Sequence, residues 1–364
     1  MNNHLMFLLF LYPTIILVLA TIPYLTRKTE NFGVSIPESM YGRDDFKAMR
    51  KKYSLLLTSI GLLTTVILFI IGLQVSEATA YIIYSVLIIV FIIGSFLLYL
   101  PFHFKMKQIK QAENWQAART QSLIIDTKFH QEKLTHSNWW FTIPVLITLA
   151  TITITFILYD VIPEQLPMHT DFSGKVTYSD KSIGTLLLIP GSQVFLVILF
   201  IFINVIIRMT KQQVSVENPD KSKRQGIIFR RRWSAYLVFT STLTAILLLF
   251  TQLSFIYPSL DNYHEPVIFT ITAIIMIVTL ALAFTTGQGG SRVNINDQHD
   301  ESVIDRDDDR FWKLGQFYVN RNDPSIFVEK RFGVGWTNNW AHPLSWVLVG
   351  ALILVIVIPI LLFS

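Results

Sequence analysis

The chain carries few residues whose type and spacing could do chemistry, and the clearest pair is His169 with Asp171. The two alternate within the polar segment 160–182, so on an extended backbone their side chains share one face. An imidazole beside a carboxylate can bind a metal ion or sense pH. Two ligands are too few for a convincing metal site. We therefore interpret the segment as a structural loop or a recognition surface, with metal binding or catalysis as the lesser alternative.

The remaining candidate motifs are incomplete. Asp305, Asp307 and Asp309 have the spacing of a calcium-binding loop, but Arg310 stands where its glycine is expected and Gln316 where its final glutamate is expected. The chain has no cysteine and none of the sequence motifs of zinc hydrolases, serine hydrolases or phosphate-binding loops. We predict that it is not an enzyme and that it binds no metal or other cofactor.

The elements that position these residues are expected to be membrane-spanning helices. Hydrophobic residues make up 52% of the chain and charged residues only 15%, which is too apolar for a soluble protein of 364 residues. A hydrocarbon core of about 30 Å requires ~20 apolar residues in a helix. Eight uncharged runs of about that length occur: Leu5–Leu25, Ser54–Leu73, Ala80–Pro101, Trp140–Tyr159, Ile183–Ile207, Ala235–Tyr257, Val267–Thr286 and Leu344–Phe363.

The positive charges predict the orientation of these spans. All of the 30 lysines and arginines except Lys175 and Lys181 lie in the loops after spans one, three, five and seven. Cytoplasmic loops retain Lys and Arg, so these four loops are expected in the cytoplasm and both termini outside it. The predicted fold class is therefore an all-α polytopic membrane protein with about eight transmembrane helices, both ends outside, and a small β-hairpin in the cytoplasmic loop before the last helix.

This pattern divides the chain into five predicted parts. Residues 1–139 form a three-helix membrane region with basic cytoplasmic loops, and residues 140–210 form a two-helix unit with the outer loop 160–182. Residues 211–290 form a membrane hairpin that follows a basic loop. Residues 291–343 are an aromatic and basic cytoplasmic segment, and residues 344–364 are the last transmembrane helix.

The predicted spans contain no Asp, Glu, Lys or Arg. Ionisable residues inside a membrane usually mark proton relays or ion sites, so their absence argues against a proton-driven pump. The polar residues that do occur are serines and threonines together with Gln193, Asn204 and Gln252. We expect them to form hydrogen bonds between helices, with the lining of a polar cavity as the alternative.

The outer loop resembles a known domain. The string LPMHTDFSGKVTYSDKS lies between two spans and is similar to the "IP-x-H-x-x-x-x-G" segment of a bacterial membrane domain of unknown function, which also occurs at the start of SdpI-like immunity and signal-transduction proteins. The resemblance depends on Pro167, His169, Gly174 and Lys181, with Leu166 in place of the usual isoleucine. The second half of the SdpI-like proteins is not recognisable here. Together with Asp171, these residues form the candidate outer recognition surface.

The segment before the last span combines aromatic and basic residues. Two β-prone runs, Gln316–Val319 and Ile326–Val328, are separated by the turn Asn320–Pro324, which predicts a hairpin. Its aromatic face is expected on the membrane surface or on other cytoplasmic loops: Phe311, Trp312, Phe317, Tyr318, Phe327, Phe332 and Trp336. Interleaved basic residues could also stack nucleic acid, but the adjacent acidic run would repel phosphate, so we predict no nucleic-acid partner.

This segment resembles a second small domain of unknown function that accompanies the first in Bacillus-type membrane proteins. The similarity depends on "DDD-x-x-WK-x-G-x-FY-x-N-x-x-DP" and "VEKRFGVGWTNNWAHP". These residues form the candidate cytoplasmic interaction surface: Trp312, Lys313, Gly315, Tyr318, Asn320, Asp323, Pro324, Lys330, Arg331, Gly335 and Trp336. Together the two resemblances imply the plasma membrane of a Gram-positive bacterium.

The expected function is non-enzymatic sensing, immunity or sequestration of a regulator. The partners implied are the lipid bilayer, a cytoplasmic regulator protein and an extracellular peptide. The alternative is a transporter or permease subunit for a neutral or amphipathic solute, which a Thr-rich set of helices permits.

Overall fold

The structure is a computed structural model that describes residues 3–115, 132–170, 176–211, 219–295, 308–351 and 353. Within these ranges seven helices are long and apolar enough to cross a membrane, so the chain is a multi-pass membrane protein. They are α1 (Asn3–Leu25), α2 (Asp44–Gly72), α3 (Glu77–Ala112), α4 (Thr142–Ile157), α5 (Ile183–Met209), α6 (Pro219–Ile256) and α7 (Asp261–Thr286). A further helix begins at Pro343, but most of the predicted eighth span lies outside the described residues.

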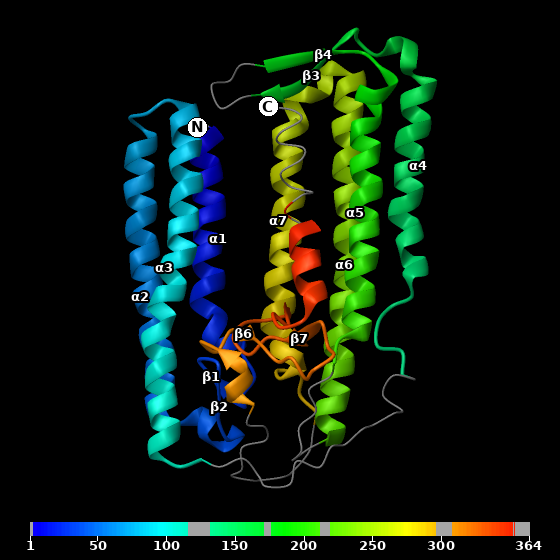
Figure 1. Cartoon of the computed structure of the whole chain (residues 1–364). Coiled ribbons are helices and arrows are strands. Elements are labelled where there is room, and N and C mark those ends of the chain that lie inside the picture. The colour runs from blue at the N-terminus through cyan, green and yellow to red at the C-terminus, as the bar shows by residue number, and fades with distance from the viewer. Residues whose placement is uncertain are drawn as a thin grey trace.

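The seven helices form two groups that stand side by side (Figure 1). α1, α2 and α3 pack against one another, and α4, α5 and α7 pack around α6. Between the groups, α1 contacts α7, where the ring centroids of Phe10 and Phe269 are 6.1 Å apart. The two groups therefore share few contacts along their length, and other segments must join them.

Three helices are longer than the apolar runs that predicted them. α2 begins at Asp44 rather than Ser54, α3 continues beyond Pro101 to Ala112, and α6 begins at Pro219 rather than Ala235. The added turns are rich in Lys, Arg and Gln, which are good helix formers. An apolar run marks only the part of a helix that lies in lipid, so the helices continue past the predicted spans at their polar ends.

The two ends of the helices differ. Strands β3 (Gln165–Thr170) and β4 (Val176–Asp180) pair antiparallel at the same end as the start of α1 (Figure 1). We call this the hairpin end. The opposite end, where α2 and α6 begin and α3 ends in segments rich in Lys and Arg, we call the basic end. Strands β1 (Glu30–Asn31) and β2 (Val34–Ser35) form a short hairpin there.

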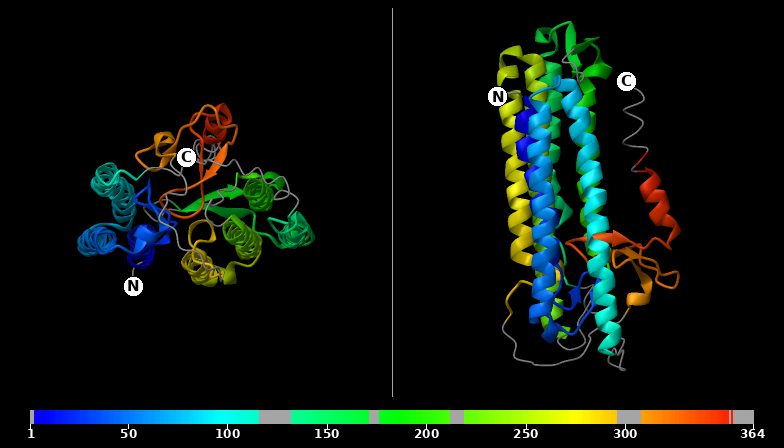
Figure 2. Two further views of the ribbon diagram at one scale, coloured as in Figure 1. Left: turned by 90° about the horizontal axis from the view of Figure 1, so that it is seen from below. Right: turned by 90° about the vertical axis from the view of Figure 1, so that its left-hand side faces the viewer.

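Residues 308–346 fold into a compact unit at the basic end, here called the cap. It contains β5 (Trp312–Lys313), β6 (Phe317–Tyr318), β7 (Phe327–Glu329) and β8 (Trp336–Asn338). Figure 2 shows it beside the helices rather than beneath them. Short 3₁₀ turns complete the described elements: Glu38–Gly42, Asn138–Phe141, Tyr159–Val161, Pro258–Leu260, Gln288–Gly290 and Asp309–Phe311.

The predicted pairing of the cap strands was wrong. The segment Gln316–Val319 does not pair with Ile326–Val328; instead β5 pairs with β6, and β7 pairs with β8. Leu314 (φ 52°) and Gly315 (φ 70°) both adopt positive φ, which allows a tight turn between β5 and β6. Side chains within the turn between β6 and β7 accept hydrogen bonds from the backbone of the same turn. The chain that follows the turn does not run back along β6.

Candidate functional site

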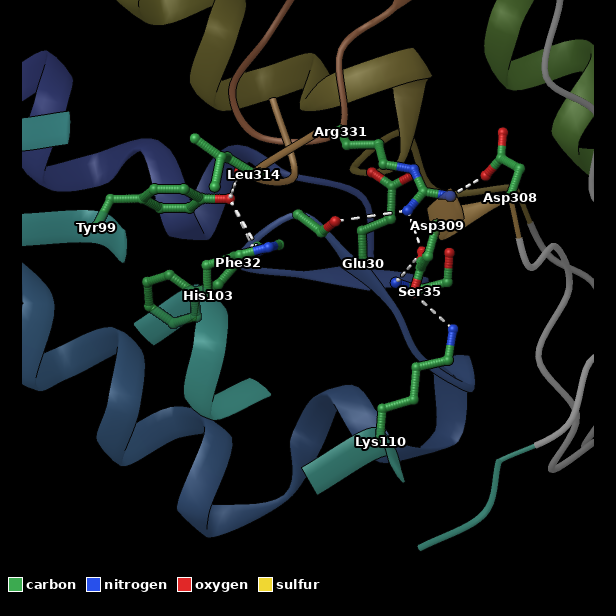
Figure 3. A network of polar contacts seen from close by, with 11 residues as sticks. Glu30, Phe32, Ser35, Tyr99, His103, Lys110, Asp308, Asp309, Leu314 and Arg331 are labelled. Atoms are coloured by element: carbon green, nitrogen blue, oxygen red, sulfur yellow. Dashed lines mark hydrogen bonds and ion pairs between the residues drawn. The ribbon is translucent and has the colours of Figure 1, made fainter. Parts of the chain in front are cut away.

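An ion-pair cluster around Arg331 joins the cap to the first helix group. Arg331 is only 2% exposed; it pairs with Asp308 and Asp309 of the cap itself (Figure 3), and its Nε lies 3.9 Å from Glu30 Oε1 in the β1–β2 hairpin. Asp309 also accepts a hydrogen bond from Lys110 Nζ on α3 at 2.7 Å and one from the backbone N–H of Ser35 at 3.2 Å. One carboxylate thus connects the cap, the β1–β2 hairpin and α3.

A second buried carboxylate connects the cap to both helix groups. Glu329 on β7 is 1% exposed and pairs with Arg27, which follows α1, and with Arg230 on α6, whose Nη2 lies 3.4 Å from Glu329 Oε1. Arg230 is fully buried and also donates to the carbonyl oxygen of Ile207 on α5 at 2.5 Å. Buried charges are stable only when paired and hydrogen-bonded, so separating the groups here would carry a large cost.

Two glycine turns meet at the same place. Gly33 in the β1–β2 turn and Gly315 in the β5–β6 turn both have positive φ, and a Cβ on Gly33 would lie 2.5 Å from the carbonyl oxygen of Gly315. Tyr99 Oη on α3 lies 3.0 Å from the carbonyl oxygens of Phe32 and Leu314. His103 Nδ1 lies 2.9 Å from the Phe32 oxygen, which makes Nδ1 the protonated nitrogen.

Aromatic rings surround these turns. Phe32 has φ 45°, an unfavourable value for a residue with a Cβ, and its ring stacks on Phe102 and Phe332 with centroids 5.1 and 5.9 Å away. Tyr53 on α2 meets Phe32 edge to face at 5.7 Å. The packing therefore fixes the unusual backbone of Phe32 and joins the cap to α2 and α3.

The cap also contacts the loop after α7. Gln288 is fully buried; its Nε2 donates to the carbonyl oxygen of Gly335 at 2.9 Å, and its Oε1 accepts from the Gly335 N–H at 2.7 Å. The Trp336 ring lies 5.4 Å from that of Phe229 on α6. Lys330 lies in the same turn, and its burial lowers the pKa of its ammonium group.

Asp323 organises the turn between β6 and β7. Its carboxylate accepts from Tyr318 Oη at 2.9 Å and from the Ser325 N–H at 3.0 Å, and it pairs with Lys211 Nζ at 3.2 Å. Burial alone would raise the pKa of this carboxyl, but the hydrogen bonds from Ser325 and Tyr318 and the charge of Lys211 lower it. The side chain of Asn339 closes the turn by donating to the carbonyl oxygens of Asn320 and Asp323.

Most of the predicted interaction residues therefore make contacts inside the protein. Trp312, Tyr318, Asp323 and Arg331 are buried, whereas Lys313 and Pro324 are exposed. Arg310, Arg321 and Phe317 of the cap are also exposed. A partner of the docked cap would have to bind exposed side chains such as these.

At the hairpin end the structure describes part of the predicted recognition surface. Pro167 is exposed and pairs across the hairpin with Tyr178, and the backbone of His169 pairs with Thr177 after a β-bulge. Asp171 and Gly174 lie outside the described residues. The position of the His169 side chain relative to Asp171 stays a prediction.

Lys181, another residue of that surface, has a structural position. Its side chain is 8% exposed; Nζ donates to the carbonyl oxygen of Ile162 at 3.0 Å and pairs with Glu164 Oε1 at 3.0 Å. The ammonium group also lies 4.9 Å from the centroid of the Tyr159 ring. Lys181 thereby joins the two strands of the hairpin to the end of α4.

A set of buried polar residues runs through the interface of α4, α5 and α6, and we call it the polar seam. Its members are each at most 3% exposed: Thr148, Thr151, Thr155, Gln193, Asn204, Ser234, Ser241 and Gln252. Gln193 Nε2 donates to Thr151 Oγ1 and to the carbonyl oxygen of Ala245, at 3.1 and 2.9 Å. Gln252 Nε2 donates to Thr155 Oγ1 and to the carbonyl oxygen of Leu186, at 3.0 and 3.3 Å.

The two glutamines are arranged reciprocally. Gln193 binds the carbonyl oxygen of Ala245, seven residues before Gln252, and Gln252 binds the carbonyl oxygen of Leu186, seven residues before Gln193. Near the basic end, Asn204 joins the seam to the chain before α4: its Nδ2 donates to Asn138 Oδ1 at 2.8 Å and its Oδ1 accepts from Ser234 at 2.6 Å. These contacts agree with the prediction of hydrogen bonds between helices. Within the described residues, no three His, Cys, Asp or Glu side chains are grouped to hold a metal ion.

Sequence reasoning missed the residues that hold the cap. All of these residues lie in charged segments that predict solvent-exposed loops, but the structure places them in ion pairs: Glu30, Glu329, Arg27, Arg230 and Lys110. All but Arg27 are buried. The only local signal was Phe32-Gly33, an aromatic residue beside a turn glycine in a segment otherwise without span character.

Comparison with family models agrees with part of the predicted resemblance. Residues 146–194 match a domain of unknown function (DUF1648), and residues 321–346 match a family of unknown function (DUF5808). The first match contains Thr148, Thr151, Thr155 and Gln193 of the polar seam, and the second lies within the cap. Comparisons with curated proteins and with solved structures gave no match. The wider likeness to SdpI-like proteins stays a prediction.

Proposed function

We propose that this protein is a non-enzymatic signalling protein of the bacterial plasma membrane, in which the outer hairpin recognises a ligand and the cap responds on the cytoplasmic side. The positive-charge distribution supports placing the basic end in the cytoplasm. The ligand implied by the family resemblance is an extracellular peptide, and the partner is a cytoplasmic regulator protein.

The observation that carries the proposal is the position of Glu329. It pairs with Arg27 beside the first helix group and with Arg230 inside the second, so the cap can dock fully only when the two groups hold one relative position. The hairpin is built on α4 and α5 of the second group. A ligand that shifts the hairpin and its helices would separate these charges and release the cap.

Site-specific photo-crosslinking in cells tests this proposal. A crosslinking amino acid at the exposed position 321 should capture a cytoplasmic protein, and the yield should rise in the E329Q variant, which weakens docking of the cap. The same probe at position 257, at the hairpin end, serves as the matched control. Absence of any adduct at position 321, in both the wild type and E329Q, would contradict the proposal.

Transport of a neutral or amphipathic solute is the second candidate. The polar seam favours it, because eight buried polar side chains line the contact of three membrane helices. Purified protein in liposomes should then accelerate the flux of such a solute, and substitution of Gln193 by leucine should reduce that flux. A signalling protein would show no flux in either form.

A further inference from the structure

The polar seam contains hydrogen-bond acceptors that the protein itself leaves unused. Gln193 Oε1 and Gln252 Oε1 have no hydrogen-bond partner among the described residues, and both side chains are 1% exposed. The hydroxyl of Ser241 is also buried without a partner in the described chain. Leaving a buried acceptor without a donor destabilises a protein, and lipid offers no donor.

Rotating the amides cannot remove these orphan oxygens. Each Nε2 faces a main-chain carbonyl oxygen, of Ala245 or Leu186, which can only accept. The threonine hydroxyls on α4 already donate their protons to the carbonyl oxygens four residues earlier, so they too can only accept from the glutamines. The chemistry of the partners therefore fixes the side-chain oxygens of Gln193 and Gln252 as free acceptors.

The seam is long enough to connect the two sides of the membrane. Ser234 and Gln252 on α6 are 18 residues apart, or about 27 Å along the helix, against about 30 Å for a hydrocarbon core. Beyond Gln252, four buried apolar side chains cover the hairpin end: Ile162, Leu166, Leu186 and Ile256. Leu166 lies on β3 and Ile162 in the segment that leads into it, so the hairpin and its entry segment close the seam.

We propose that the polar seam is a binding site for internal water, with molecules held by the Gln193 and Gln252 oxygens and closed off by the apolar residues of the hairpin. The missing partner must be a small hydrogen-bond donor or a cation. The described seam contains no carboxylate, so a cation would lie in the membrane without a counter-charge, whereas water is neutral and satisfies two or more polar groups. This inference does not depend on the signalling role.

Radiolytic hydroxyl-radical labelling tests the proposal, because the radicals form from water already inside the protein. The natural chain has no cysteine, so a single introduced thiol reports on one position. In lipid nanodiscs, the S241C and T148C variants should be oxidised several times faster than L149C. Leu149 is adjacent to Thr148 at the same depth but is 52% exposed toward lipid, which makes it the matched control.

The outcomes separate water from the alternatives. Equal protection of all three thiols would mean a dry seam and overturn the proposal. Labelling that disappears when choline is replaced by sodium or potassium would assign the oxygens to a cation and overturn it as well. Labelling that is independent of the salt, and that is lost from S241C when Gln193 is changed to leucine, supports water held by the glutamine oxygen.

Discussion

The cap interface and the polar seam use opposite chemistry to fix helices. At the basic end, Arg331, Glu329 and their partners bury full charges as ion pairs next to stacked aromatic rings. In the seam, neutral amides and hydroxyls join three helices, and several of their atoms have no described partner.

The difference follows from the surroundings of each region. A charge in a loop can be buried after folding because the chain brings its counter-ion, whereas a charge within lipid is costly even before the helices meet. The cap is therefore expected to separate as a unit when one charge is lost, and the seam to change gradually.

The largest effect is expected from removing Arg331. The R331M variant leaves Asp308 and Asp309 in the interface without the guanidinium group that they share, and losing one partner of a buried ion pair costs about 3–5 kcal/mol. Limited chymotrypsin digestion of nanodisc samples should show rapid cleavage of the cap. Arg310 is exposed, so R310M should be cleaved as slowly as the wild type. If the two variants behave alike, the ion pairs do not hold the cap.

The meeting of the two glycine turns predicts a somewhat smaller effect. In G315A the new methyl group would lie 2.5 Å from Tyr99 Oη and 2.7 Å from His103 Nδ1, so overpacking of about 1–3 kcal/mol adds to the cost of positive φ. Gly333 has φ +104°, but its nearest neighbour is 3.9 Å away, so G333A carries the backbone cost alone.

Thermal unfolding and cap cleavage should therefore rank G315A below G333A in stability. Equal stability of the two variants would mean that Gly315 is not packed closely against Tyr99.

The contrast between the two regions also explains what the sequence could and could not predict. Charge-free runs predicted the membrane helices, because burial in lipid requires uninterrupted apolar residues. Polar residues inside these runs need partners on other helices, and this predicted the hydrogen bonds of Gln193, Asn204 and Gln252. The cap interface escaped prediction because it joins residues as distant as Glu30 and Arg331, and nothing local marks a loop charge as buried.

The seam predicts small and graded effects. Removing the Thr151 hydroxyl in T151V takes away one acceptor of Gln193, and hydrogen bonds between membrane helices contribute about 1 kcal/mol or less. T153V is the matched control, because Thr153 lies on the same helix but is exposed toward lipid.

A double-mutant cycle of T151V with Q193L, read out by thermal unfolding, should show coupling between the two positions. Additive effects would indicate that the two side chains do not interact.

The smallest effect concerns pH and sets the cap apart from the neutral seam. The pKa of Asp323 is lower in the folded cap than the ordinary value of about 4, so its ionised form stabilises the fold. This contribution is fully present above the ordinary pKa and is lost as pH falls through the lowered one. Acid should therefore speed cleavage of the cap. An acid-stable protease such as pepsin measures this.

The D323N variant should be cleaved faster than wild type near neutral pH, as read with chymotrypsin, and should lose part of the acid sensitivity. The seam variant T151V should keep the wild-type pH profile, because the residues that it affects do not titrate. An unchanged acid response in D323N would mean that the ionisation of Asp323 does not set the pH dependence of the cap.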